Sequence, residues 1–415
     1  MHGEGNLKSG GSYKWVVLFA AMIIVGMGLG SLFSIAVFLK PVSAHFDWPR
    51  GQTAFAYSSA AFLQGLSGIM MGTLADRFSA RPVVFFGALM AGGSLVLLGF
   101  VQSLWQLYLL YGVCLGALGL AGFLTPLVAN IGHWFDRNRG LALGILMAGQ
   151  SLGGGIVPPL ARYLIATYGW REAYIILGIT SWAVMLPLAL LIGERPGIAE
   201  AKRLSRAEEK APGHARPLME PWKMTAVLCT AIVMCCICMS IPLVHVVALV
   251  TDVGISGTTA AGIFSAMMLT SIVGRVGIGK LADYIGGIRA LLLASAGQTV
   301  MIFWFTQMTT PPGFYLIAVL FGLGYGGVIP AYAIIIREYF PLHRVGMTVG
   351  LVFFFGNLGM GLGGFLGGLL FDLSGTYTFS YATGAATGTV NLLIVGSLLY
   401  FLSTQRPGLA VPEPA

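Results

Sequence analysis

Charge is scarce in this sequence of 415 residues. Only 9% of the residues are Asp, Glu, Lys or Arg and 57% are hydrophobic, whereas soluble domains carry about 25% charged residues. So few charges cannot cover a water-exposed surface, and the mean hydropathy of +0.85 excludes an ordinary soluble domain. We therefore expect the chain to reside in a lipid bilayer.

Long polar segments are also lacking, because uncharged runs recur between short breaks along nearly the whole chain. A membrane-spanning helix needs about 20 mostly apolar residues, and the runs predict an all-α integral membrane protein with twelve transmembrane helices. The first run is too long for a signal-peptide core and has no convincing cleavage site, so it counts as a helix. The predicted spans are 15–40, 52–75, 82–102, 105–132, 140–166, 171–192, 222–249, 257–281, 288–309, 313–337, 345–371 and 377–403.

Cysteines and buried acid/base pairs are too few to support catalysis or metal binding. All five cysteines lie in predicted spans, where we interpret them as small apolar side chains: Cys114, Cys229, Cys235, Cys236 and Cys238. No disulfide framework, metal site or cofactor is expected. An enzyme would need a paired acid/base set inside the spans, so we expect neither enzymatic activity nor catalytic residues. A sensor that has lost transport would look the same in sequence.

Basic residues are distributed unevenly about the predicted spans. With a cytoplasmic N-terminus, the inner segments hold 18 of the 23 Lys and Arg residues and the outer segments hold Lys40, Arg50, Arg162 and Arg171. This positive-inside pattern predicts that both termini are cytoplasmic. The net charge of +8 thus reflects topology, and no nucleic acid partner is expected because no aromatic-rich basic surface accompanies it. Short loops favour a prokaryotic inner membrane.

The longest inner loop carries mixed charge and proline, "ERPGIAEAKRLSRAEEKAPGHARP", and separates six spans from six. It divides the chain into a cytoplasmic N-terminus, an N-terminal six-helix half, a cytoplasmic linker, a C-terminal six-helix half and a cytoplasmic tail. The expected boundaries are 1–14, 15–192, 193–221, 222–403 and 404–415.

The two halves resemble each other in sequence. "GTLADRF" (72–78) recurs as "GKLADYI" (279–285) at an offset of 207 residues, and Gly119, Gly122, Phe135 and Arg139 recur at an offset of 205 within 324–344. The repetition predicts two pseudo-symmetric halves. Parallel six-helix repeats are one architecture of secondary transporters, with the substrate bound near the midplane where the repeats meet.

The loop "GTLADRFSARP" resembles the loop 2/3 signature of the major facilitator superfamily, although Ser79 stands where that signature has glycine. The resemblance implies the major facilitator fold and transport by alternating access. It also implies a conformational motif at the ends of the helices, to which we assign Asp76, Arg77, Arg81, Asp283 and Arg139.

A narrower resemblance lies in "WFDRNRGLALGILMAGQSLGG" (134–154), which is similar to the helix 4/5 signature of the monocarboxylate transporter family. "GGSYKWVV" (10–17) weakly resembles that family's approach to helix 1. The implied function is secondary transport of small monocarboxylates such as lactate or pyruvate. Small residues four apart allow close helix packing, so we interpret Gly149 and Gly153, with Gly144 and Ala148, as packing surface, and likewise the stripe Gly359, Gly363 and Gly367.

Arg275 lies inside the predicted span 257–281, six residues before its end, whereas every other Lys or Arg lies in a loop or closer to the end of a span. A charge at the centre of a span costs about 2.5–3.5 kcal/mol, and a guanidinium presents a planar fork that matches a carboxylate. The family resemblance implies the same role for an arginine in this helix. We expect the substrate to bind Arg275 together with polar and aromatic residues of the surrounding spans: Gln150, Ser271, Tyr332, Phe354 and Asn357.

The residues that handle protons in better-known members of the family are missing here, because Ser271 and Phe33 stand where an Asp and a Lys are expected. The nearest other titratable groups are Lys40, His245 and Asp252, at the outer ends of two helices that are equivalent in the two halves. We expect them to form an outer gate and to couple proton movement to substrate transport, so that the protein is a proton symporter. The expected partners are a monocarboxylate anion, a proton and the lipid bilayer.

Two other transport functions remain as alternatives. An oxalate/formate-type exchanger shares the arginine at Arg275 but needs a second cation in the span 345–371, which holds no Lys or Arg. A drug exporter is suggested only by the loose antiporter-like pattern "GQSLGGGIVPP", and a deep arginine argues for anions. The sequence leaves open the particular monocarboxylate, the direction of transport, the oligomeric state and the need for an accessory subunit.

Overall fold

The structure is a computed structural model that describes the backbone of residues 5–135, 139–193, 220–340 and 342–405. Within these ranges the side chains of residues 5–12, 69, 76, 132–133, 139–141, 342–346 and 405 lie outside the described part. Most of the predicted linker 193–221 and of the predicted tail 404–415 also falls outside it, as do residues 1–4 of the predicted N-terminal segment 1–14.

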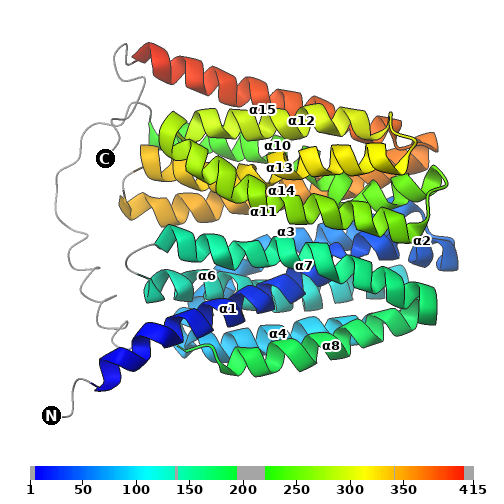
Figure 1. Ribbon diagram of the computed structural model, residues 1–415, viewed down its shortest axis with the longest axis horizontal. Helices are drawn as coiled ribbons and strands as arrows, with labels where there is room; N and C mark the ends of the chain where they lie inside the picture. The colour runs from blue at the N-terminus through cyan, green and yellow to red at the C-terminus, as the bar shows by residue number, and fades with distance from the viewer. Residues whose placement is uncertain (1–4, 136–138, 194–219, 341, 406–415) are drawn as a thin grey trace. The chain divides into compact units, whose positions relative to one another are not determined.

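The described chain is helical from end to end and contains no strand. Figure 1 shows its helices, whose bounds are α1 Gly5–Phe33, α2 Ile35–Phe46, α3 Arg50–Phe78, α4 Ala80–Leu98, α5 Leu104–Tyr108, the π-helix η1 Leu109–Leu120, α6 Ala121–Trp134, α7 Arg139–Tyr168, α8 Trp170–Leu190, α10 Pro221–Asp252, α11 Gly257–Ile285, α12 Gly287–Phe305, α13 Pro311–Tyr339, α14 Leu342–Ser374 and α15 Thr378–Gln405. The prediction of an all-α membrane protein is confirmed.

Each of the twelve predicted spans corresponds to one helix or to consecutive helices. Eleven helical segments in the described residues are long and apolar enough to cross a membrane. The twelfth predicted span is α3, which is 29 residues long but carries polar residues along its length, among them Ser58, Ser59 and Gln64.

Two predicted spans are interrupted in a way that the apolar pattern did not indicate. The span 15–40 comprises α1 and α2, which are separated at Ser34. The span 105–132 comprises α5, η1 and α6, and the hydroxyl of Ser94 in α4 donates to the carbonyl of Leu110 at the start of η1. A side chain that competes for a helical carbonyl is a common cause of such local rewinding.

Local signals in the sequence explain several helix starts. Pro221 and Pro311 occupy the first turns of α10 and α13, where a missing N–H costs nothing and the fixed φ suits a helix. Ser256 precedes α11, and its side-chain oxygen accepts a hydrogen bond from the backbone N–H of Thr259 at 3.2 Å. This is the usual N-cap arrangement.

The internal repeat is visible in the backbone. In the described residues, positive φ angles occur at six positions: Asp47 (55°), Ser79 (80°), Gly169 (93°), Gly254 (91°), Gly286 (82°) and Gly375 (71°). They form three pairs, 47/254, 79/286 and 169/375, at offsets of 207, 207 and 206 residues. Ser79 and Gly286 also share ψ, at 154° and 156°. The duplicated sequence therefore folds into duplicated turns.

The helices group into two compact units. One comprises Met1–Ser34 and Leu66–Ala211, and the other comprises Ile35–Gly65 and Pro212–Ala415. The second unit thus includes α2 and the first part of α3 together with α10–α15. The predicted boundaries of the two six-helix halves stay a prediction.

In the first unit, α1 packs closely along α7. A Cβ atom at Gly149 or Gly153 of α7 would collide with the backbone carbonyl of Met22 or Gly26 in α1. Small residues are therefore required at these two positions, as the packing interpretation expects. No described atom lies within 4 Å of a Cβ built at Gly144, so that interpretation does not extend to it.

In the second unit, α10 packs against α14 and α15, while α13 packs against α11 and α12; Figure 1 draws these helices in green to red. The predicted glycine stripe of α14 faces α10. A Cβ at Gly359 would lie 2.6 Å from the carbonyl oxygen of Val233, and one at Gly363 would lie 2.5 Å from that of Ile237. The stripe brings α14 close enough for its backbone to contact α10 directly.

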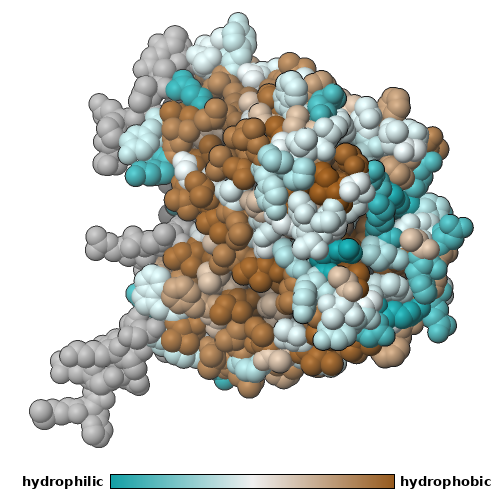
Figure 2. Space-filling model, turned by 45° about the vertical axis from the view of Figure 1, so that its right-hand side comes forward, coloured by the Kyte–Doolittle hydropathy of each residue, from teal (hydrophilic) through white to brown (hydrophobic). Residues whose placement is uncertain are grey.

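Many large apolar side chains are exposed, including Phe100, Trp105, Val276 and Leu393, each more than 60% accessible. Figure 2 shows this on the face it draws as broad hydrophobic areas, with hydrophilic residues gathered toward one edge. A monomeric soluble protein rarely exposes large apolar patches, so this surface fits contact with lipid chains.

Candidate functional site

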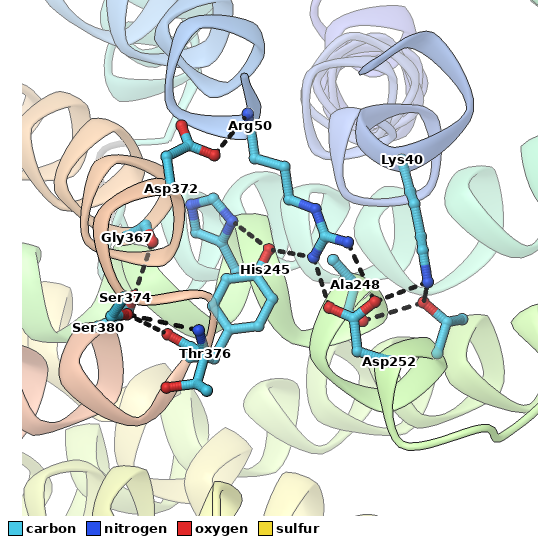
Figure 3. A network of polar contacts seen from close by, with 12 residues as sticks. Lys40, Arg50, His245, Ala248, Asp252, Gly367, Asp372, Ser374, Thr376 and Ser380 are labelled. Carbon is cyan, nitrogen blue, oxygen red and sulfur yellow. Dashed lines mark hydrogen bonds and ion pairs between the residues drawn. The ribbon is translucent and has the colours of Figure 1, made fainter. Parts of the chain in front are cut away.

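Six polar residues of the second unit form a network that we name the Asp252 cluster: Lys40, Arg50, His245, Asp252, Asp372 and Tyr377. Figure 3 shows this network and labels all of these residues except Tyr377. Lys40 comes from α2, and Arg50 is the first residue of α3. His245 and Asp252 lie on the last two turns of α10, Asp372 lies near the end of α14, and Tyr377 directly precedes α15. Four helices and the residue before a fifth therefore meet in this cluster.

Asp252 forms ion pairs with both cations of the cluster, Lys40 and Arg50. Its Oδ1 lies 2.7 Å from Lys40 Nζ and 3.0 Å from Arg50 Nη2, and its Oδ2 lies 2.5 Å from Arg50 Nη1. The arginine thus binds the carboxylate with both arms of its fork, the strong bidentate geometry. The Lys40 ammonium also donates to Thr251 Oγ1 at 3.2 Å.

Arg50 is the residue with the most contacts in the cluster, and the sequence analysis missed its role. Its Nη1 donates to the Tyr377 hydroxyl at 3.3 Å, and its guanidinium lies 4.0 Å above the ring of Phe371. Cation–π contact of this kind adds to the attraction. The side chain is only 15% exposed, which sets it apart from a solvated loop arginine.

Asp372 binds the first turn of α3. Its two carboxylate oxygens accept hydrogen bonds from the backbone N–H groups of Arg50 and Gly51 at 2.9 and 2.6 Å. A helix N-terminus has N–H groups without a partner inside the helix and carries the positive end of the helix dipole. A carboxylate there accepts hydrogen bonds from these N–H groups and is attracted by the positive end. Here the cap comes from a helix more than 300 residues away in sequence, so no local motif could have revealed it.

His245 is completely buried in the cluster. Its Nε2 lies 2.8 Å from the carbonyl oxygen of Gly364, and its Nδ1 lies 3.3 Å from the hydroxyl of Tyr377. Gly367 makes room for the ring, because a Cβ there would lie 2.8 Å from Nε2. Of the three residues predicted for the gate, Lys40 and Asp252 are in direct contact, while His245 joins them through Tyr377 and Arg50.

The predicted substrate-binding residue Arg275 lies on α11, ten residues before its last residue, which is about 15 Å along the helix axis. Its side chain is partly buried, and its guanidinium carbon lies 5.8 Å from the ring centre of Tyr325 on α13. Tyr325 was not among the predicted residues. Ser271, one turn before Arg275, is buried, and its hydroxyl donates to the carbonyl of Met268.

The other predicted binding residues are distributed over several helices. Phe354 and Asn357 of α14 approach α3, where a Cβ at Gly65 would lie 3.3 and 3.1 Å from them. Both side chains are partly buried. Tyr332 is fully buried, and its hydroxyl donates to Asn391 of α15 at 3.2 Å, so it takes part in contacts between α13 and α15. Gln150 belongs to α7 in the first unit.

The predicted conformational motif is described only in part, because the side chains of Asp76 and Arg139 lie outside the described residues. The Arg77 guanidinium lies 5.3 Å from the ring of Phe78. Arg81 Nε donates to the carbonyl of Ile192 at 2.8 Å, just after α8. Asp283 is exposed near the end of α11.

A further carboxylate lies near Asp283 and was not predicted. Glu338 of α13 accepts hydrogen bonds from the backbone N–H of Gly287, the first residue of α12, at 3.1 and 3.2 Å. As at Asp372, a carboxylate from one helix caps the start of another.

Among the described residues, no group of three or more His, Cys, Asp or Glu is placed to hold a metal ion. Four of the five cysteines are buried, and all five are free thiols.

Comparison with known proteins extends over nearly the whole chain. A family model for the Major Facilitator Superfamily matches residues 15–306 and 226–415. Monocarboxylate transporter 13 of Rattus norvegicus is 29% identical over 415 residues, covering 96% of this chain and 92% of that protein. Monocarboxylate transporter 2 of Homo sapiens is 26% identical, covering 95% and 88%. The uncharacterized MFS-type transporter YcxA of Bacillus subtilis is 28% identical, covering 95% and 96%.

Solved structures agree on the fold. A bacterial homolog of the human lysosomal transporter Spinster, inward-facing and occupied, gives a TM-score of 0.70 at 18% identity and covers 97% of this chain and 99% of its own. The peptide transporter POT in complex with sulfate gives 0.72 at 14% identity, covering 95% and 94%. These identities support the fold alone. With its duplicated turns, its membrane helices and a family model matched from residue 15 to residue 415, the chain belongs to the Major Facilitator Superfamily and is a transporter related to the monocarboxylate transporters.

Proposed function

We propose that this transporter carries small monocarboxylates of the lactate or pyruvate type by proton-coupled symport. The observation that carries the substrate class is Arg275, a partly buried guanidinium about 15 Å inside α11, beside the ring of Tyr325. A guanidinium keeps its charge at every physiological pH and binds a carboxylate through two parallel hydrogen bonds. The names of its relatives point to the same substrate class.

The size of the substrate is inferred from Arg275 and from the residues of α14 that were predicted to bind the substrate with it. One cation is enough for one carboxylate, and α14 carries no Lys or Arg between Val345 and Ser374 to bind a second. Phe354 and Asn357, one turn apart on α14, offer an apolar ring and an amide. A short apolar tail next to a polar head suits such a pair, so small monocarboxylates fit this combination better than dicarboxylates.

Proton coupling is supported by charge balance and by the Asp252 cluster. An anion that entered alone would be opposed by an inside-negative potential, at about 2.3 kcal/mol per charge for each 100 mV. One proton per anion removes this cost. The ion pairs of Asp252 with Lys40 and Arg50 join α2 and α3 to α10, so they have to break if these helix ends separate. We propose that they form the outer gate.

The test is uptake of labelled lactate into proteoliposomes that contain the purified protein. An inward proton gradient, with the outside acidic, should drive accumulation above equilibrium, and unlabelled pyruvate should compete while oxalate should not. Uptake that follows the membrane potential and ignores the pH gradient would exclude proton symport. No uptake of any monocarboxylate under either gradient would exclude the substrate class.

A further inference from the structure

The Asp252 cluster contains two groups that could carry the coupled proton, Asp252 and His245, and their surroundings differ. Both oxygens of Asp252 are bound by cations, with the Arg50 fork on one side and Lys40 on the other. Two positive charges within hydrogen-bond distance favour the ionised carboxylate. Asp252 therefore holds no proton while these ion pairs are made.

The hydrogen bonds of His245 determine where its own proton lies. A carbonyl oxygen can only accept, so Nε2, which is 2.8 Å from Gly364 O, carries the hydrogen in the neutral ring. Nδ1 is then an acceptor and receives the hydroxyl hydrogen of Tyr377, since a neutral imidazole has one donor and one acceptor nitrogen. Tyr377 in turn accepts from Arg50 Nη1. Each group in this chain donates to the next, from Arg50 through Tyr377 and His245 to Gly364.

A second proton on His245 conflicts with this arrangement. It would sit on Nδ1 and face the O–H of Tyr377, which would have to turn away. It would also place an imidazolium, in a completely buried position, two hydrogen bonds from the guanidinium of Arg50, and like charges that close repel. The charged and titratable groups around His245 are Arg50, Lys40, Asp252, Asp372 and Tyr377. Their charges already balance when His245 is neutral.

We propose that His245 is the residue that takes up the coupled proton and that Tyr377 positions the imidazole of His245. In this position, protonated His245 and the closed Arg50–Asp252 pair exclude each other. The role in coupling rests on the proposed proton symport. Linkage makes the effect reciprocal: breaking the pair lets His245 accept a proton, and a proton on His245 favours the broken pair. Tyr377 is a positioning residue, because its hydroxyl links Arg50 to Nδ1 of His245.

The test follows the protonation of His245 directly. The full-length protein is labelled with ¹⁵N-histidine in lipid nanodiscs and titrated by NMR, and His245→Gln identifies the signal. In the unaltered protein His245 should be neutral with its hydrogen on Nε2 while the Arg50–Asp252 pair is closed. Arg50→Gln should strengthen its proton affinity about tenfold or more, a shift of at least one pH unit.

Two further variants separate this mechanism from a general change in structure. Tyr377→Phe should reduce the shift that Arg50→Gln causes, because the hydrogen-bonded link is gone. Lys223→Gln, which alters a cation at the other end of α10, should leave the titration unchanged. If Arg50→Gln does not fold, Arg50→Lys keeps the charge but loses the fork, and it should give a smaller shift in the same direction.

An unchanged His245 titration in the folded Arg50 variants would overturn the proposal. So would an infrared carboxylic acid band that appears on acidification, while His245 stays neutral, and that disappears in Asp252→Asn. None of these measurements uses transport. A protein that fails to take up lactate would refute the proposed substrate and leave this test intact.

Discussion

At the scale of single residues, the structure distinguishes two arginines that the sequence presents differently. Arg275 stood out because it interrupts a long uncharged run. Arg50 did not stand out, because it lies in a polar segment between two predicted spans, yet it binds Asp252, Tyr377 and, through its backbone, Asp372. A charge inside an apolar run indicates a function because placing it in the membrane costs free energy. A charge near the surface indicates a function only through the residues that it contacts.

Replacing Arg275 by Lys or Ala is expected to lower substrate binding about tenfold or more, since a charged hydrogen bond contributes about 1.5–3 kcal/mol. Lysine keeps the charge but loses the planar fork, so both variants should be impaired while folding survives. Equilibrium binding and proteoliposome uptake measure the effect, with Arg289→Lys, an exposed arginine at the start of α12, as the control. Full uptake by both Arg275 variants would refute its assignment.

Gly367→Ala should destabilise the protein, because the added Cβ would lie 2.8 Å from Nε2 of His245 and 2.5 Å from its Cδ2. The imidazole has to move and loses its hydrogen bond to Gly364, at a cost of about 1–3 kcal/mol. Thermal unfolding in detergent measures the change. Gly396→Ala in α15, where a Cβ meets nothing within 4 Å, is the matched control and should be neutral or slightly stabilising.

At the scale of helices and turns, the duplication gives a comparison within one chain. Ser79 and Gly286 precede α4 and α12 with nearly the same backbone angles, in a region of φ and ψ that is essentially restricted to glycine. The second copy of the motif has the suitable residue and the first does not. The backbone of the turn is therefore retained against the preference of its own residue, which means that the flanking helices determine it.

Ser79→Gly should accordingly stabilise the protein by about 1 kcal/mol, because it relieves a conformation that costs a non-glycine residue about 1–3 kcal/mol. Gly286→Ser should destabilise it by a similar amount. A Cβ at Gly286 meets nothing within 4 Å, so a steric clash with neighbours does not complicate the comparison. Unfolding temperatures of the two variants decide the matter, and shifts of the same sign would contradict this explanation.

At the scale of the whole molecule, the proposed coupling of proton and substrate requires residues that are far apart in the sequence. Arg275 lies on α11, while the Asp252 cluster gathers the middle of α2 and the ends of α3, α10 and α14 with the residue before α15. Substrate binding and gating are thus assigned to different side chains. A variant in one group should leave the function of the other largely intact.

Asp252→Asn should therefore reduce proton-driven accumulation severalfold while equilibrium binding at Arg275 changes little. The neutral amide removes the charge that pairs with Lys40 and Arg50. The proposed outer gate then lacks its ion pairs at every pH. Accumulation under an inward proton gradient and binding in detergent are measured on the same preparation. Asp47→Asn, a nearby exposed residue with positive φ that asparagine also tolerates, is the control. If Asp252→Asn and His245→Ala both retain full proton-driven uptake, the coupling lies elsewhere.

The membrane helices, the duplication and the superfamily could all be predicted without tertiary information. Apolar length decides whether a segment can cross a bilayer, because every backbone polar group in lipid has to be satisfied within the helix. These are local properties, and each of the twelve predicted spans is helical. Repeated motifs at a constant offset likewise need no tertiary information, and the paired turns confirm them.

The contacts between polar residues, in contrast, became known only from the folded chain. Arg50 and Asp252 are 202 residues apart, Arg50 and Asp372 are 322 apart, and His245 and Tyr377 are 132 apart. Contacts over such separations leave no period or spacing in the sequence, so Arg50, Asp372 and Tyr377 could not be found there. Tyr332 illustrates the converse, since its place on a predicted lining helix did not reveal that it binds Asn391. Which face of a helix meets which neighbour depends on packing, and packing is a property of the folded chain.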